Sequence, residues 1–207
     1  MGTALHSESL EPMEVYRTLY DNELCPTWTR PQEMFHEEVS PGVTRFQKVG
    51  VVRVVAPEDE ARVLSFGHDA WGEGSSQENF VEGYKTDPNH IRGTRYLLEI
   101  SNEGIVANIN TLRFGRGLIG LASLSVDPVH RRKGYAHLLL RAVMELFRQE
   151  LPTTRFLLFS EVPPEIYEKL GFRRLPSEFQ FFLPSVAMIS GGADVSEREL
   201  SLFREYF

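Results

Sequence analysis

The apolar positions between residues 118 and 151 follow two different patterns, which meet at a basic turn. Residues 118–126 (LIGLASLSV) are almost continuously apolar, which is typical of a buried strand, and an Asp-Pro pair ends that run. From Leu139 to Phe147 the apolar residues recur at spacings of three and four, until Pro152 ends the pattern. The segment therefore predicts a strand, a turn and an amphipathic helix in succession.

The turn between this strand and this helix carries an unusual charge. A helix N-terminus favours acidic side chains, yet residues 130–133 are His-Arg-Arg-Lys, and Gly134 follows with no side chain to crowd a ligand. The free N–H groups and the dipole of a helix start bind anions. The residues therefore favour an anion, such as a phosphate, held at this turn. A solvated basic turn on a surface helix is the alternative.

Patterns elsewhere in the chain predict a mixed α/β domain. Further strands are expected at 50–56, 95–101, 105–114 and 154–160, and helices should begin at Pro57, Ser75 and Glu165. Residues 87–90 are predicted to form a loop, and residues 179–183 an antiparallel closing strand. Because a strand, a helix and a strand follow one another between 118 and 160, the two strands should be parallel, with a right-handed crossover.

Two further segments flank this domain, so we expect three parts, residues 1–49, 50–190 and 191–207. A helix over 11–24 is predicted from apolar residues at helical spacing: Met13, Tyr16, Leu19, Tyr20 and Leu24. This stripe must be buried, either against the core domain, as a helical extension packed on it, or against a second subunit, as in a homodimer. Residues 25–49 should form an ordered loop or a short strand. A capping box and three later apolar residues predict a C-terminal helix: Leu200, Phe203 and Phe207.

Composition and charge narrow the classes of function. The chain has 207 residues, a net charge of −7 and one cysteine, Cys25. A general nucleic-acid binder would be basic, and no apolar run approaches the ~20 residues of a membrane span. The N-terminal sequence lacks the basic and apolar regions of a signal peptide, and a single cysteine fits a reducing cytoplasm. No metal-binding spacing of His or Cys is present, so we expect a cytoplasmic protein without nucleic-acid, membrane or metal partners.

Two motifs, Arg131-x-x-Gly134-x-Ala136 and residues 167–172 (YEKLGF), resemble those of a known family. The first is similar to the acyl-CoA pyrophosphate loop of the GNAT superfamily of N-acetyltransferases, Arg/Gln-x-x-Gly-x-Gly/Ala, and the second to the YxKxGF segment of that family. The resemblance implies an α/β fold of the GNAT acyl-CoA N-acyltransferase type. That fold has a mixed sheet of six or seven strands, splayed central parallel strands and helices on both faces. It also implies acetyl transfer from acetyl-CoA to an amine of a small molecule, peptide or protein by direct attack.

The resemblance also assigns residues to acetyl-CoA. The backbone of Leu124, Ser125 and Val126 would bond the pantetheine, with the Leu124 N–H facing the acetyl carbonyl. Backbone N–H groups of residues 132–136 would bind the pyrophosphate, and Arg131 or Arg132 would reach the adenosine 3′-phosphate. The implied cofactor site is therefore Leu124, Ser125, Val126, Arg131, Arg132, Lys133, Gly134, Tyr135 and Ala136.

Tyr167 and Glu161 are the candidate catalytic residues. Tyr167 resembles the tyrosine that many family members place near the CoA sulfur, where a phenol can protonate the leaving thiolate. A tyrosine that packs the short helix against the sheet is the alternative. In some members a glutamate on the central strand acts as the general base, and this chain has Gly120 at that position. Glu161 is the remaining acid, acting through water, unless it is a solvated loop residue. Ser160 stands where many members have asparagine.

Two other functions compete with acetyl transfer. A non-catalytic acyl-CoA-binding or regulatory protein on the same fold would explain the departures at Gly120 and Ser160. An interaction module that binds phosphorylated or nucleic-acid partners through the basic turn is a third class, which the net charge of −7 disfavours. The acceptor is not identified by the sequence. Its pocket should be built from residues 57–91 and 173–195, where His68 and Trp71 lie.

Overall fold

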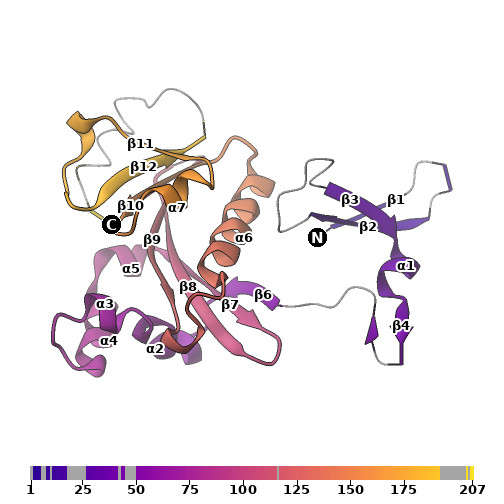
Figure 1. Cartoon of the computed structure of the whole chain (residues 1–207), viewed down its shortest axis with the longest axis horizontal. Coiled ribbons are helices and arrows are strands. Elements are labelled where there is room, and N and C mark those ends of the chain that lie inside the picture. The colour runs from indigo at the N-terminus through magenta and orange to yellow at the C-terminus, as the bar shows by residue number, and fades with distance from the viewer. Residues whose placement is uncertain are drawn as a thin grey trace. The chain divides into compact units, whose positions relative to one another are not determined.

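The chain forms two compact units, Met1–Val49 and Gly50–Phe207, which are drawn in Figure 1. A computed structural model describes residues 2–5, 8–9, 11–17, 27–41, 43–44, 50–115, 117–191, 204 and 206–207. None of the helices in this described part is long and apolar enough to cross a membrane. Within the same residues, no group of three or more His, Cys, Asp or Glu side chains is placed to hold a metal ion.

The first unit contains an antiparallel sheet in the order β1-β2-β3. Its elements are β1 (Gly2–Leu5), β2 (Pro12–Arg17), β3 (Thr27–Pro31), α1 (Gln32–His36), β4 (Glu38–Ser40) and β5 (Val43–Thr44). The helix predicted over 11–24 is wrong at residues 12–17, because β2 is the central strand and its backbone pairs on both sides. Pairing with distant strands overrides a local helical spacing. Residues 18–26, which include Leu19, Tyr20, Leu24 and Cys25, lie outside the described part.

The second unit is built on a mixed seven-stranded sheet, in the order β11-β12-β10-β9-β8-β7-β6. The strands are β6 (Gly50–Val54), β7 (Thr94–Ile100), β8 (Gly104–Arg113), β9 (Leu118–Val126), β10 (Arg155–Ser160), β11 (Phe172–Arg174) and β12 (Val186–Ser190). Only β9 and β10 pair in parallel among these strands. The predicted strand, helix and parallel strand between 118 and 160 are confirmed.

Helices cover both faces of this sheet, as the fold prediction required (Figure 1). They are α2 (Pro57–Ser65), α3 (His68–Trp71), α4 (Gln77–Thr86), α5 (Pro88–Arg92), α6 (Tyr135–Glu150) and α7 (Glu165–Glu168), with 3-10 turns η1 (Pro128–His130) and η2 (Ser177–Phe179). The apolar stripe of α6 packs into the largest core cluster, and Val63 of α2 and its C-cap residue Phe66 belong to a smaller one. Apolar residues of the predicted strand, now β9, and of the predicted helix, now α6, therefore pack in one core cluster.

Two local predictions around α4 and α5 need correction. Ser76, rather than Ser75, caps α4, because its side chain accepts the Asn79 N–H at 3.2 Å. The loop predicted at residues 87–90 is instead the start of α5. The Asp87 carboxylate accepts hydrogen bonds from the N–H groups of Asn89 and His90 at 2.6 and 3.0 Å. Asp87 is therefore the N-cap of α5, and Pro88 occupies the first helical position, which proline tolerates.

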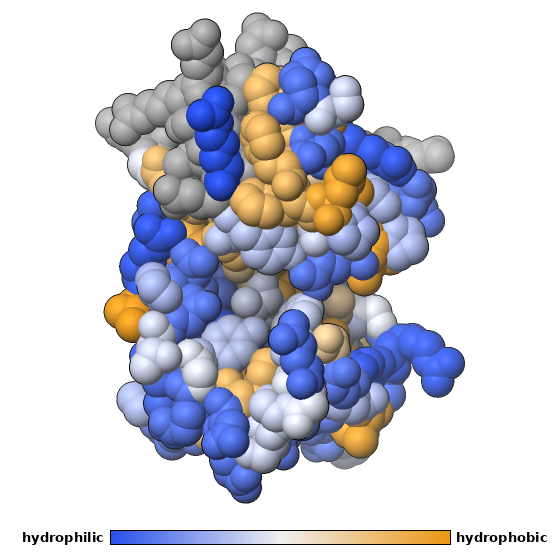
Figure 2. All heavy atoms as spheres, turned by 90° about the vertical axis from the view of Figure 1, so that its left-hand side faces the viewer, coloured by the Kyte–Doolittle hydropathy of each residue, from blue (hydrophilic) through white to orange (hydrophobic). Residues whose placement is uncertain are grey.

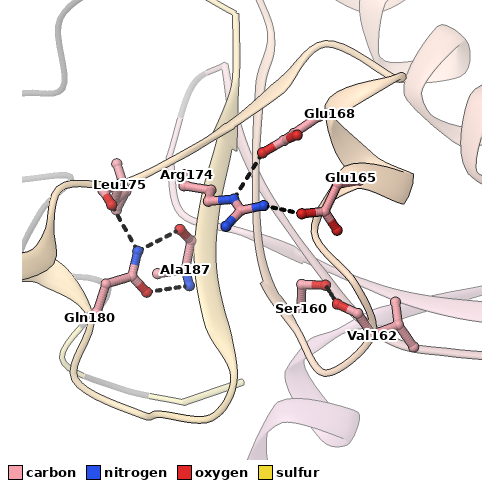
Figure 3. Close-up of polar contacts among 8 residues, drawn as sticks. All are labelled: Ser160, Val162, Glu165, Glu168, Arg174, Leu175, Gln180 and Ala187. Carbon is pink, nitrogen blue, oxygen red and sulfur yellow. Dashed lines mark hydrogen bonds and ion pairs between the residues drawn. The ribbon is translucent and has the colours of Figure 1, made fainter.

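The closing strand predicted at residues 179–183 is also wrong. Its first residue, Phe179, is the last residue of the turn η2. The strand that pairs antiparallel with β10 is β12, which also pairs with the edge strand β11. Gln180 explains the difference, because its side-chain amide donates to the carbonyls of Leu175 and Ala187 and accepts the Ala187 N–H (Figure 3). A side chain thus occupies backbone groups that a further strand would use. Most of the predicted C-terminal helix, residues 192–203 and 205, lies outside the described part.

Candidate active site

The central parallel strands β9 and β10 separate after three residue pairs. Residues 118–120 pair with residues 155–157, and the pairing ends there. On its other side β9 contains a bulge, because Ser123 and Leu124 together face the single residue Ile109, and Ser123 has a φ of 48°. The bulge bends β9 away from β10, so the backbone beyond Gly120 has no strand partner on the β10 side.

A cavity of about 570 Å³ lies along this gap. Its walls combine residues of the bulged strand, of β10 and of the helices α3 to α5, and it is lined among others by Leu124, Leu158, Glu161, Tyr167, Trp71 and Tyr84. Figure 2 shows the molecule hollowed at mid-height on the face where α3 and α4 lie. A volume of this size matches pockets that hold small molecules.

The basic turn presents backbone donors to open space. Gly134 is the N-cap of α6 and has a φ of 84°, which glycine adopts without strain. The first intrahelical bond runs from the Leu138 N–H to the Gly134 carbonyl at 3.0 Å, so the N–H groups of Tyr135 and Ala136 have no carbonyl within the helix. Apart from Gly134 itself and its two chain neighbours, no described residue would have a heavy atom within 4 Å of a Cβ placed on Gly134. The turn is therefore suited to an anion.

The side chain of Arg131 is paired with other residues of the protein. Its Nη1 and Nη2 contact Oδ2 and Oδ1 of Asp69 on α3 at 2.6 and 2.7 Å, and it also donates to the carbonyls of Phe66 and Val126. These hydrogen bonds from Arg131 lower the pKa of Asp69, and the Asp69 carboxylate raises the pKa of Arg131. Arg131 thus fastens the turn to α3 and to the end of β9.

Glu103 holds the other side of the same turn. It accepts hydrogen bonds from Lys133 Nζ at 2.9 Å and from the Tyr135 hydroxyl at 2.7 Å, and these bonds lower its pKa. His130 Nδ1 lies 2.8 Å from the same carboxylate. Arg132, with a φ of 63° and an exposed side chain, makes no ion pair within the described part of the chain. Of the three basic residues at 131–133, Arg132 is therefore the one available to an outside anion.

Tyr167 lines the cavity from α7. Its hydroxyl makes no hydrogen bond to any described residue, and its ring packs edge-on against Phe172 at 5.9 Å. Burial, and then the negative charge of Glu161, raise its pKa, so the phenol keeps its proton at neutral pH. Arg174 secures the helix through ion pairs to Glu165 and Glu168 (Figure 3). The structure thus brings an unpartnered phenol to the cavity on an anchored helix.

Glu161 stands on the same cavity, at the end of β10. Its carboxylate accepts the Trp71 indole N–H at 2.7 Å and the Tyr206 hydroxyl at 2.5 Å. Burial and the bond to Glu161 raise the pKa of Tyr206 to about 12. Glu161 is therefore exposed but fixed, rather than a freely solvated loop side chain. His68 is engaged elsewhere, with Nε2 2.7 Å from the Ser75 carbonyl oxygen and its ring against Phe80.

The two positions that depart from the family pattern have local explanations. A Cβ on Gly120 would lie 2.6 Å from the Phe114 ring and 2.8 Å from the Phe207 ring, so aromatic side chains occupy the space beside it. Ser160 is buried, and its hydroxyl donates to the Val162 carbonyl at 2.6 Å (Figure 3). Neither position contributes a polar group to the cavity.

Three polar residues that the sequence analysis did not single out belong to this site. Asn108 is fully buried and links the Val63 carbonyl, the Ser125 hydroxyl and the Arg95 guanidinium. Arg95 and Asn110 line the cavity. Each lies at a buried position of a strand, and a polar residue among apolar strand neighbours is the signal by which they can be found.

Comparison with protein families gives two separate matches. Residues 92–174 match a family model described as an acetyltransferase (GNAT) domain. Residues 1–48 match a different model, described as a protein of unknown function, DUF1653. No curated protein matches the chain.

Solved structures of N-acetyltransferases share the fold of the second unit. A spermidine N-acetyltransferase chimera from Vibrio cholerae and hSSAT is 14% identical, with a TM-score of 0.55, over 76% of this chain and 99% of that one. The ribosomal-protein-S18-alanine N-acetyltransferase from Escherichia coli is 16% identical, with a TM-score of 0.53, over 72% and 97%. Ard1 from Thermoplasma volcanium is 17% identical, with a TM-score of 0.52, over 71% and 100%. At these identities the likeness concerns the fold.

Proposed function

We propose that this chain, which carries an acetyltransferase domain of the GNAT superfamily, transfers an acetyl group from acetyl-CoA to an amine by direct attack. The observation that carries the proposal is the gap between β9 and β10, which opens beside the bulge at Ser123 and Leu124. One end of β9 leads into the glycine turn, and the cavity beside the gap holds Tyr167 and Glu161. An anion site, an unpaired strand edge and two titratable groups thus lie along one path.

The chain's own groups fit acetyl-CoA along this path. The backbone of Leu124, Ser125 and Val126, which has no strand partner on the β10 side, would bond the pantetheine amides as a neighbouring strand would. The N–H groups of the turn, over 132–136, would bind the pyrophosphate. Arg132 is the cation we assign to the 3′-phosphate, because Arg131 and Lys133 are already paired with Asp69 and Glu103. Arg131 and Lys133 therefore hold the turn in place, and Arg132 contacts the ligand.

The proposed reaction forms an amide bond and breaks a thioester. The amine nitrogen attacks the acetyl carbonyl while the Leu124 N–H stabilises the negative charge on its oxygen. Tyr167 then gives its proton to the departing thiolate. Glu161 attracts the ammonium form of the acceptor and, through a water molecule, takes the proton that the nitrogen loses. A direct attack needs no nucleophile on the protein.

A non-catalytic acyl-CoA-binding or regulatory protein is the second candidate. Phe114 and Phe207 leave no room for a carboxylate at Gly120, and Glu161 already accepts two hydrogen bonds, which leaves it fewer lone pairs for a proton. Both candidates require acetyl-CoA to bind, and only the first requires turnover. A cytoplasmic location, a homodimer and the division into residues 1–49, 50–190 and 191–207 remain proposals from the sequence.

Thermal denaturation with acetyl-CoA, followed by a thiol-release assay with a panel of amines, tests the proposal. Acetyl-CoA at ~100 times its Kd should add about 2.7 kcal/mol to the free energy of unfolding, and desulfo-CoA should give most of that gain. The panel should include free amino acids, polyamines, aminoglycosides and peptide N-termini. Stabilisation with turnover of an amine supports acetyl transfer. Stabilisation without turnover favours the non-catalytic candidate, and no stabilisation at millimolar ligand contradicts both.

A further inference from the structure

Arg95 on β7 is a buried cation that forms no ion pair with any carboxylate of the described residues. Its exposed fraction is 7%, and within the described part of the chain its side chain donates one hydrogen bond, from Nη1 to Asn108 Oδ1. Nε and Nη2 are buried and make no hydrogen bond to any described residue. The ring of Tyr84 lies 5.5 Å from the guanidinium carbon. Burial lowers the pKa of Arg95 to about 10, which expresses the cost of keeping this charge away from water.

The unused donors lie on one edge of the guanidinium. Nε–H and Nη2–H point in the same direction, and this pair matches the two oxygens of a carboxylate. Nη1, which points elsewhere, is the nitrogen that the protein itself binds through Asn108. A buried charged donor without an acceptor is destabilising. The presence of such donors on Arg95 therefore suggests a ligand that accepts hydrogen bonds from them.

Arg95 lines the cavity in which we place the proposed acetyl transfer. It is paired across the sheet with Asn110 on β8, and Asn110 is paired with Ala122 on β9, so these residues form one row. All three line the cavity, as do Leu124 and Tyr167. A ligand group at Arg95 would therefore occupy the same cavity as the attacking nitrogen.

Two other residues of the cavity wall each have a buried atom without a partner among the described residues. Asn110 Nδ2 donates to the Asn89 carbonyl at 3.0 Å, while its Oδ1 is unbonded. His90 Nε2 lies 3.1 Å from Glu60 Oε1, while its Nδ1 is unbonded. Both residues line the cavity. A ligand with hydrogen-bond donors beside an anionic group would satisfy these atoms and Arg95 together.

We propose that the acceptor is an amine that also carries a carboxylate, such as a free amino acid, and that Arg95 binds this carboxylate side-on. The inference rests on the proposed acetyl transfer and names its substrate class. Asn110 Oδ1 accepts from an N–H of the same ligand. The aromatic side chains of Trp71, Phe80 and Tyr84 line the rest of the cavity and give an apolar substituent a place to pack.

Matched sets of amines test this assignment. Each common amino acid is compared with its amide and with the amine formed by its decarboxylation, and thiol release from acetyl-CoA gives kcat/KM. The natural protein should prefer the best amino acid over its amide by about 10- to 100-fold, the range expected for hydrogen bonds to a charged group. Arg95→Met should abolish this preference, whereas Arg95→Lys, which keeps the charge but loses the fork, should retain part of it.

Two controls separate this inference from the proposed function. Acetyl-CoA should raise the Tm of both variants as it raises that of the natural protein, which shows that the fold and the acetyl-CoA site are intact. If amides and simple amines are acetylated as well as amino acids, or if the preference survives in Arg95→Met, the carboxylate assignment is overturned while acetyl transfer stands.

Binding decides the question if no amine is acetylated. In the presence of CoA, N-acetyl amino acids should raise the Tm more than the corresponding N-acetyl amides, and the difference should vanish in Arg95→Met. Equal shifts from the acids and the amides, or no shift from either, would overturn a carboxylate site at Arg95.

Discussion

Arg131 and Asp69 form a two-point ion pair, with Nη1 to Oδ2 at 2.6 Å and Nη2 to Oδ1 at 2.7 Å. The pair joins the basic turn to α3, a helix 62 residues earlier in the chain. Both side chains remain about half exposed, so solvent weakens the pair. Its value is positional, because it fixes the turn and leaves Arg132 facing outward.

The pair should give the stability of the protein a specific pH dependence. Arg131 holds the pKa of Asp69 below its ordinary value, so Asp69 contributes stability above its unfolded pKa of ~3.9 and loses it as the pH falls through the folded pKa. Asp69→Asn should therefore lower the Tm near neutral pH, and its deficit should shrink below about pH 4. Thermal denaturation between those pH values measures this. A deficit that is the same at every pH would assign Asp69 a role other than its charge.

Replacement of Gly134 tests the anion site in the turn. Asn and Asp have nearly the same shape, and both tolerate a positive φ better than most residues, so Gly134→Asn and Gly134→Asp should lose similar stability. Only the Asp side chain adds a negative charge beside the proposed pyrophosphate. We expect Gly134→Asp to bind acetyl-CoA more than about tenfold more weakly than Gly134→Asn, as measured by calorimetry. Equal affinities would place the phosphates elsewhere.

Arg132 should distinguish CoA from a CoA without its 3′-phosphate. Arg132→Gln should weaken acetyl-CoA binding by about tenfold, the loss expected for one charge-assisted contact, and should leave the affinity for the dephospho form nearly unchanged. Lys133→Gln is the matched control, because Lys133 is paired with Glu103. A larger effect on acetyl-CoA at Lys133 than at Arg132 would contradict the assignment.

Tyr167→Phe tests the proposed proton donor. The ring that packs on Phe172 is kept, and the hydroxyl, which has no partner among the described residues, is removed. We expect kcat to fall by about 10²–10⁴-fold, with little change in the KM for acetyl-CoA. Because the pKa of Tyr167 is raised, the natural protein should keep its activity up to alkaline pH.

Tyr167→Ala separates this role from packing. If Tyr167 is only structural, the Ala variant should lose both Tm and activity, while the Phe variant should retain the activity. A fully active Phe variant would remove Tyr167 from the mechanism and leave water as the proton donor.

The strand, turn and helix around Gly134 were predictable because their signals are local. The apolar run of β9 and the helical spacing of α6 each lie within one element, and both are confirmed. β2 was not predictable in this way, because its partners β1 and β3 decide its conformation. The closing strand was misplaced because residues 179–183 form no strand, and the side chain of Gln180 bonds the backbone of Ala187 in β12.

For the candidate site too, residues within local motifs were predictable, and residues defined by contacts between distant parts of the chain were not. The motifs pointed to Tyr167 and to the turn, and the structure places Tyr167, Glu161 and Leu124 on one cavity. The sequence did not show which arginine of the turn is occupied, because Asp69 is remote from it in sequence. Arg95 was passed over for a similar reason. Its isolation is visible only when the groups that surround it in space are known.

A single-turnover experiment tests the account's central claim most directly. The protein, in excess over radiolabelled acetyl-CoA, is mixed with the best amine of the panel, and acetyl-amine, free CoA and protein-bound label are measured over time. Direct attack predicts that acetyl-amine and free CoA appear together, one for one, with no label on the protein. Acetyl-CoA that binds but is never consumed with any amine, or label that passes through the protein, would contradict the account.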